Sequence, residues 1–154
     1  MDLSKILRPA AVKVLANTSS KKRLFQDLGD IVESCYGLDS NKAFTALQSR
    51  ESLGPTGVGH GVALPHARLE GLDKVVGAFI RIEKPLDFDA VDRQPVDLIF
   101  ALFAPDGAGV DHLKALALVS RTMRNADTTA KLRANDEPDT LYTILIESQG
   151  TRAA

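Results

Sequence analysis

The sequence has few cysteines, almost no net charge and no long apolar run, and each of these absences excludes a class of protein. Its only cysteine is Cys35, so the chain cannot form an internal disulfide, which suits a reducing compartment. The charges of its 19 basic and 20 acidic residues nearly cancel, so the chain has no positive net charge that would attract it to nucleic acid or to an anionic membrane. No run of about 18 apolar residues occurs, and Met1–Pro9 lacks the apolar segment of a signal peptide. These features predict a soluble, cytoplasmic protein that neither inserts into a membrane nor binds nucleic acid.

The length of the chain and its even composition limit the number of domains that it can form. A chain of 154 residues is long enough to bury one apolar core without the support of disulfides or metals. Neither an internal repeat nor a low-complexity segment divides it. We therefore expect residues 1–154 to form a single domain.

Apolar residues at helical spacing predict five helices. The clearest has Leu24 and Leu28 on one face and ends at Gly37, because glycine readily adopts the left-handed conformation that closes a helix. Polar capping residues mark where each helix begins. The expected starts are residues 17–20, Asp39 or Ser40, Asp111, Asp127 and residues 136–138. The second helix should end near Glu51, and His112 falls in the first turn of the helix that Asp111 caps.

Segments with strand character separate these helices. Residues 11–15 alternate partly, and residues 75–82 are rich in β-branched and aromatic side chains. Residues 95–103 are apolar nearly throughout, as expected for a central strand that is covered on both faces. Residues 84–89 include Pro85, which lacks a backbone donor, so they predict a bend or a short edge strand. The alternation predicts an α/β fold: a mixed β-sheet of about five strands flanked by helices on both faces.

The most unusual stretch of the sequence is Ser49–Arg68. It holds four of the eleven glycines, two of the seven prolines and two of the three histidines, His60 and His66. Glycine lets a backbone approach a ligand closely, and Pro65 restricts the conformation of the chain just before His66. The composition therefore favours a segment that presents His66 to a ligand or a reactant.

Nucleotide and metal sites fit this stretch poorly. The glycine spacing does not match the dinucleotide motif, because Val62 or Leu64 stands where its last glycine is required, and the Walker motif is not met either. His60 and His66 are six residues apart across a proline, which is not a standard spacing for metal ligands. We therefore expect neither a metal nor a cofactor. Three interpretations of His66 stay open: a loop histidine bonded to backbone, part of a site for a free anion, or a phosphoryl carrier.

A phosphoryl carrier has simple requirements. Neutral imidazole is a good nucleophile near physiological pH, and its phosphoryl adduct can pass the group onward. The site must then stabilise about two negative charges, which backbone N–H groups and an arginine can do. The residues that would supply these groups are Thr56, Gly57, Gly59 and Gly61 as a phosphate-binding loop, with Arg50 and His112. His60 and Pro65 are expected to shape the loop around His66.

Three blocks of the sequence resemble a known family. Ser49–Arg68 is similar to the phosphorylation-site signature of the fructose/mannitol-type IIA domains of the bacterial phosphotransferase system. Pro95–Leu102 and Asp111–Lys114 resemble that family's second and third blocks, in the same order. The resemblance covers nearly the whole chain, and the joint match of three blocks is far more specific than any one alone. It implies a mixed sheet of about five strands with helices on both sides.

The resemblance also implies a site and a function. His66 would be the phosphohistidine, with Arg50 and His112 as its active-site partners. A free-standing domain of this family looks most like the nitrogen-regulatory branch, in which phosphate comes from a small histidine phosphocarrier. Its phosphorylation state would control regulatory targets such as a potassium transporter or a sensor kinase. The alternative that it implies is a sugar-specific IIA component of the fructose/mannitol type, which passes phosphate to a separate IIB domain during sugar uptake.

Overall fold

The computed structural model describes residues 2–153, with side chains described through Ser148. Within this range the helices are α1 (Leu3–Ile6), α2 (Lys21–Tyr36), α3 (Ser40–Glu51), α4 (Gly109–Arg124), α5 (Ala126–Arg133) and α6 (Pro138–Ala153). The strands are β1 (Leu7–Leu15), β2 (Gly57–Gly59), β3 (Val62–Ala63), β4 (His66–Leu69), β5 (Val76–Leu86) and β6 (Val96–Pro105). None of the helices in this part of the chain is long and apolar enough to cross a lipid bilayer.

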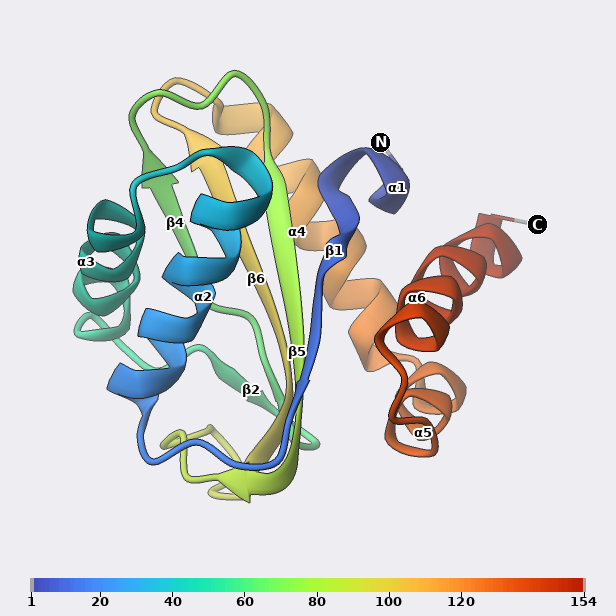
Figure 1. Cartoon of the computed structure of the whole chain (residues 1–154). Coiled ribbons are helices and arrows are strands. Elements are labelled where there is room, and N and C mark those ends of the chain that lie inside the picture. The colour runs from blue at the N-terminus through green and yellow to red at the C-terminus, as the bar shows by residue number, and fades with distance from the viewer. Residues whose placement is uncertain (1, 154) are drawn as a thin grey trace.

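The strands form one mixed sheet between two layers of helices (Figure 1). Its order is β1-β5-β6-β3-β2, and β4 also pairs with β6. β5 runs antiparallel to β6, whereas β3 and β4 run parallel to it, and β1 runs parallel to β5. α2 and α3 cover one face, and α4 and α6 lie on the other with α5 beside them. The predicted α/β fold is confirmed, with six strands where about five were expected.

β6 is the centre of the sheet, as its apolar sequence predicts. Eight of its ten residues are buried, and the exceptions are Asp97 and the terminal Pro105, which are partly exposed. Phe100 of β6 packs edge-on against Phe79 of β5, with 6.1 Å between ring centroids. A strand with neighbours on both sides and helices on both faces is held firmly in place. It therefore fixes the positions of the residues that pair with it.

The helices α2 and α3 form where the sequence predicts them, and local caps explain their ends. The Ser20 side chain accepts the Arg23 N–H at the start of α2. α2 stops at Gly37, whose φ of 73° is the left-handed conformation expected of a closing glycine. Asp39 then caps α3 by accepting the Lys42 N–H, and α3 ends at Glu51 as predicted.

Two predicted caps lie inside their helices instead of in front of them. α4 begins at Gly109, so Asp111 is within its first turn, where its charge complements the positive end of the helix dipole. α5 is capped by Asn125, and Asp127 is again within the first turn. Asn125 has this role because it ends α4 in an extended conformation, from which its side chain accepts the Thr128 N–H.

Two strands extend beyond their predicted bounds. β1 begins at Leu7, directly after the short helix α1, which no sequence pattern predicted. β5 continues through Pro85 to Leu86, and its register with β6 shifts between Arg81 and Leu86. The exposed proline is accommodated at this irregular end of the strand, so the segment is neither a separate bend nor an edge strand of its own.

The glycine-rich stretch folds into a hairpin followed by a further strand. β2 and β3 are joined by the two-residue turn His60–Gly61, in which φ is 56° and 76°. Two-residue hairpin turns of this kind require positive φ at both positions, which glycine adopts freely and histidine rarely. Leu64 and Pro65 then separate β3 from β4, which begins at His66, and the Pro65 carbonyl remains bonded to β6.

Candidate functional site

His66 is the first residue of β4, which within the described chain pairs with β6 alone. The Pro65 carbonyl accepts the Leu102 N–H at 3.0 Å, and this bond anchors the backbone just before His66 to β6. The Nδ1 atom of His66 lies 2.9 Å from the Leu64 carbonyl oxygen. Because a carbonyl only accepts hydrogen bonds, Nδ1 carries the hydrogen, and Nε2 of the neutral ring keeps a free lone pair.

Side chains from two helices meet His66 in a cavity of about 390 Å³. Arg50 reaches it from the last turn of α3, and His112 reaches it from the first turn of α4. The ring centroids of His66 and His112 are 5.6 Å apart, with the two planes at 70°. The structure therefore brings together three residues that the sequence separates widely.

Arg68 also lines this cavity, and sequence reasoning missed it as a site residue. It lies two residues after His66 in β4, and alternate residues of a strand point to the same side. Its exposed guanidinium makes one long contact, 3.4 Å from Nη1 to the Asp106 carbonyl oxygen. The alternation of side chains along a strand would have identified Arg68, but only if the sequence had shown that a strand begins at His66.

The lining of the cavity suits an anion better than a metal ion. It includes the guanidinium groups of Arg50 and Arg68, and none of its described lining residues is acidic. Across residues 2–148, no group of three or more His, Cys, Asp or Glu side chains is placed to hold a metal. Arginine pairs well with phosphate because its planar donors match the phosphate oxygens.

His112 is the group whose proton affinity the site changes. Burial lowers its pKa from the ordinary value of 6.5, and the nearby His66 and Arg68 lower the pKa further. Its Nε2 atom is buried and has no hydrogen-bond partner in the described part of the chain. His112 is therefore neutral at neutral pH, and it places an uncharged polar ring beside His66.

We expect an NMR pH titration to show His112 titrating below 6.5 in the unmodified protein. His66→Ala should raise the pKa of His112, because it removes one cause of the lowering. Arg68→Gln should raise it less, because the arginine is the smaller of the two charge effects. Neither variant should restore the ordinary value, since burial is the main cause. An unchanged His112 titration in both variants would contradict this account.

The same lowering of the pKa makes His112 a source of acid sensitivity. Below pH 6.5 the unfolded chain, whose histidine titrates normally, binds the proton more readily than the folded chain does. The contribution of His112 to stability is therefore fully present above that pH, and it is lost as the pH falls through the lowered folded-state value. Replacing His112 with glutamine removes this part of the pH dependence.

A buried carboxylate, that of Glu51, holds the turn after Arg50. It accepts the Thr56 N–H at 3.0 Å, the Thr56 hydroxyl at 2.6 Å and the Lys21 ammonium at 2.8 Å. Arg50 itself donates from Nη1 to the Gly54 carbonyl at 3.0 Å. The sequence does not reveal this role of Glu51, because Lys21 belongs to a different helix and no short motif links the two.

The residues of the predicted phosphate-binding loop make contacts of their own, and the Thr56 carbonyl accepts the Leu64 N–H. Thr56 is buried and bonded to Glu51, and none of Thr56, Gly57, Gly59 and Gly61 lines the cavity around His66. Gly61 turns the β2–β3 hairpin, and its carbonyl accepts the N–H groups of Asp97 and Leu98.

His60 also lies in this hairpin, and it does not line the cavity around His66. It donates its N–H to the Asp92 carboxylate at 2.9 Å, and this bond is the main cause of a lowered pKa of Asp92. Its carbonyl accepts from Arg133 at 2.7 Å. These backbone contacts hold the hairpin turn in place, while the cationic groups at His66 come from Arg50 and Arg68.

Comparison with known proteins identifies relatives across the whole chain. The family described as the EIIA 2 component of the phosphoenolpyruvate-dependent sugar phosphotransferase system matches residues 5–148. The chain is 41% identical to a nitrogen regulatory protein of Bradyrhizobium diazoefficiens over 153 aligned residues. This alignment covers 99% of the chain and 100% of the relative. The chain is also 37% identical to a fructose-specific EIIA component of Haloferax volcanii over 109 aligned residues. This alignment covers 71% of the chain and 71% of the relative.

A solved structure agrees with these sequence relatives. The crystal structure of the nitrogen regulatory protein IIA-Ntr from Neisseria meningitidis matches with a TM-score of 0.84 at 37% identity, covering 92% of this chain and 97% of that one. The resemblance drawn from the three sequence blocks is thereby confirmed. The chain belongs to the EIIA 2 family of the phosphoenolpyruvate-dependent sugar phosphotransferase system.

Proposed function

We propose that the protein is a phosphohistidine relay of the nitrogen-regulatory branch of the phosphotransferase system, with His66 as the acceptor. The observation that carries the proposal is the contact between Nδ1 of His66 and the Leu64 carbonyl. It selects the ring form in which Nε2 is the nucleophile. The similarity to nitrogen regulatory proteins supports the regulatory branch.

The transfer step balances without an added proton donor or cofactor. The Nε2 lone pair of His66 forms a new N–P bond while the N–P bond of the donor phosphohistidine breaks. The donor nitrogen takes back its electron pair, and the donor ring, which carries a hydrogen on its other nitrogen, becomes neutral imidazole. His66 keeps the hydrogen on Nδ1, so the product is an imidazolium that carries a phosphoryl dianion. The Leu64 carbonyl accepts the charged N–H, a hydrogen bond that strengthens when the ring becomes cationic.

Two arginines and a neutral histidine supply the charge stabilisation. Arg50 and Arg68 place cationic donors around the cavity without an acidic lining residue to compete for them. His112 stays neutral because its pKa is lowered, so it offers an N–H to a phosphoryl oxygen without repelling the arginines. Phosphoryl transfer depends on such positioning and charge compensation more than on covalent help from the protein.

Exposed apolar side chains around the cavity support a protein as the phosphoryl donor. Leu53 lines the cavity and is 83% exposed, while Val110 and Leu113, which flank His112 in α4, are 65% and 69% exposed. Contiguous exposed apolar groups around a polar centre are typical of protein docking surfaces. We assign the donor as a small histidine phosphocarrier of the nitrogen branch.

The regulatory output would follow from the charge that phosphorylation adds. A phosphoryl group brings close to two negative charges to the same surface that docks partners, so it favours some targets and repels others. We place the protein in the cytoplasm, where a single unpaired cysteine is stable, and we propose regulatory targets such as a potassium transporter or a sensor kinase.

One finding supports a second candidate, a sugar-specific IIA component. The fructose-specific EIIA component of Haloferax volcanii is 37% identical over the aligned residues, which is close to the value for the nitrogen regulatory relatives. In that role the phosphoryl group of His66 would pass to a separate IIB domain during sugar uptake.

A parallel transfer assay tests the proposal. The protein is incubated with labelled phosphoenolpyruvate, the enzyme that charges the carrier, and either a nitrogen-branch or a sugar-branch phosphocarrier. We expect an acid-labile label on Nε2, located by NMR, and transfer at least about tenfold faster from the nitrogen-branch carrier, which corresponds to about 1.4 kcal/mol of discrimination. Faster transfer from the sugar-branch carrier, with onward transfer to a fructose-type IIB domain, would establish the alternative. No label from either carrier would refute both.

A further inference from the structure

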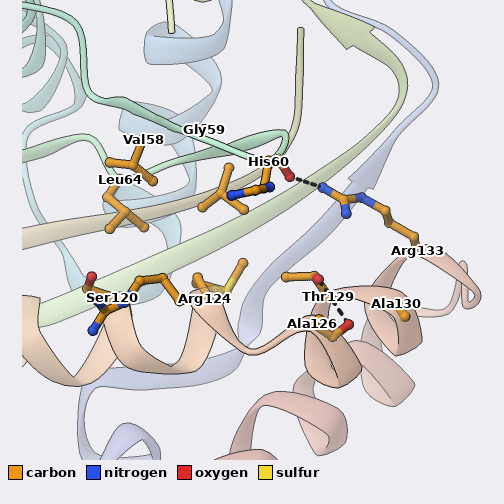
Figure 2. Close-up of a pocket in the computed structure, with 12 residues that line it drawn as sticks. Val58, Gly59, His60, Leu64, Ser120, Arg124, Ala126, Thr129, Ala130 and Arg133 are labelled. Atoms are coloured by element: carbon orange, nitrogen blue, oxygen red, sulfur yellow. Dashed lines mark hydrogen bonds between the residues drawn. The ribbon is translucent and has the colours of Figure 1, made fainter. Parts of the chain in front are cut away.

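A second and larger cavity lies between the glycine-rich hairpin and the helices α4 and α5. Its volume is about 610 Å³, and it shares no described lining residue with the cavity at His66. Figure 2 shows the hairpin residues Val58, Gly59 and His60 facing residues of α4 and α5 across it. A volume of about 300–1,000 Å³ is typical of sites for small organic molecules.

The walls of this cavity follow from helical spacing. Met123 and Arg124 lie three and four residues after Ser120 on α4, so one face of that helix points into the cavity. Ala126, Thr129, Ala130 and Arg133 do the same on α5. Ala126 and Ala130 have the smallest side chains on that face, and they leave the space that a larger residue would fill.

The deep wall of the cavity is apolar. Val62, Leu64 and Met123 line it, and each is at least nine-tenths buried from solvent. Thr129 also lines the cavity, and its hydroxyl donates to the Ala126 carbonyl at 3.2 Å (Figure 2). A ligand that fits this wall therefore needs an apolar body.

Two arginines, Arg124 and Arg133, line the cavity, and they differ in how far other residues compensate their charges. Arg133 is held by the Asp97 carboxylate at 2.9 Å and by the His60 carbonyl at 2.7 Å, so its charge is largely compensated. Arg124 is exposed and has no ion pair or hydrogen bond from its side chain to another described residue. None of the described lining residues is acidic. An anionic group on the ligand would therefore be attracted to Arg124.

We propose that this cavity is a binding site for a small organic anion that combines an apolar body with one acidic group. The apolar body packs against Val62, Leu64 and Met123, and the acidic group pairs with Arg124. The absence of acidic lining residues disfavours a cationic ligand, and the uncompensated arginine disfavours a neutral one. The site does not depend on phosphorylation of His66.

Two fluorescent probes with the same ring skeleton test the proposal. Anilinonaphthalene sulfonate has one sulfonate, and phenylnaphthylamine has none. We expect the unmodified protein to bind the sulfonate more tightly than the uncharged probe. Arg124→Gln should raise the Kd of the sulfonate about tenfold and leave that of the uncharged probe unchanged. Arg121→Gln, which changes an exposed arginine of the same helix outside the cavity, is the matched control and should change neither Kd.

A second variant separates this cavity from other apolar surfaces. Ala130 is exposed and lines the cavity, so Ala130→Trp should fill the space and abolish binding of both probes without disturbing the core. His66→Ala should bind both probes normally, which distinguishes this site from the proposed phosphorylation site. The proposal is overturned if Arg124→Gln binds the sulfonate as tightly as Arg121→Gln does, if Ala130→Trp still binds the probes, or if the uncharged probe binds more tightly than the sulfonate.

Discussion

Replacing His66 with alanine abolishes phosphoryl acceptance under conditions that fully label the unmodified protein. The expected loss is complete because the variant lacks the Nε2 lone pair that forms the new N–P bond. Intact-mass measurement after incubation with a charged phosphocarrier checks this result, with circular dichroism to show that the fold is kept. His66 is partly exposed at the start of an edge strand, so its truncation leaves the apolar core unchanged.

The matched control for this experiment is His60→Asn. Asparagine tolerates the positive φ of 56° found at this position, so the hairpin turn is preserved. The contacts of His60 with Asp92 and Arg133 are made by its backbone, and asparagine keeps them. This variant should be labelled at the rate of the unmodified protein. Labelling of His66→Ala, or loss of labelling in His60→Asn, would show that the wrong histidine has been assigned.

Replacing Glu51 with alanine destabilises the protein by about 2–3 kcal/mol, because it removes the shared partner of a part-buried ion pair and of two buried donors. The Glu51 side chain is 8% exposed and that of Lys21 is 21% exposed, so solvent does not readily replace the lost carboxylate. The variant also leaves the N–H and the hydroxyl of Thr56 without their acceptor. Urea denaturation of the variant and of the unmodified protein measures the difference.

Glu70→Ala is the control for this prediction, because Glu70 is an exposed acid with no hydrogen bond or ion pair to another described residue. Its free energy of unfolding should change by no more than about 0.5 kcal/mol. Glu51→Gln should lie between the two, since the amide oxygen still accepts one of the Thr56 bonds. Equal stability of Glu51→Ala and Glu70→Ala would mean that the contacts of Glu51 do not stabilise the fold.

The parts of the fold that the sequence predicts are those with a strong local or compositional signal. α2 combines a helical apolar face, a Ser20 cap and a closing Gly37, and each acts within a few residues along the chain. β6 is predicted because burial on both faces leaves an apolar sequence that few other elements share. The site residues His66, His112 and Arg50 came from the chemistry of phosphoryl transfer together with the family resemblance.

The parts that could not be predicted depend on distant partners. β2, β3 and β4 are at most four residues long, and their sequences become strands only because β6 or a hairpin partner lies beside them. Local spacing also does not show that Asp92 and Asp97 lie next to the glycine-rich hairpin, because both residues are more than thirty positions further along the chain. Arg68 was missed for the same reason, since its orientation follows from a strand that the local sequence does not predict.

The order of elements along the chain determines when the protein can begin to work. β3 and β4 precede β6 in the sequence but pair with it, so neither has its place in the sheet until Val96–Pro105 has been synthesised. His112 follows later still, in α4. During translation Arg50, His66 and Arg68 are therefore made before β6 and before His112. Chains that end before α4 lack His112, so they would lack part of the proposed acceptor site and should compete poorly for a phosphoryl donor.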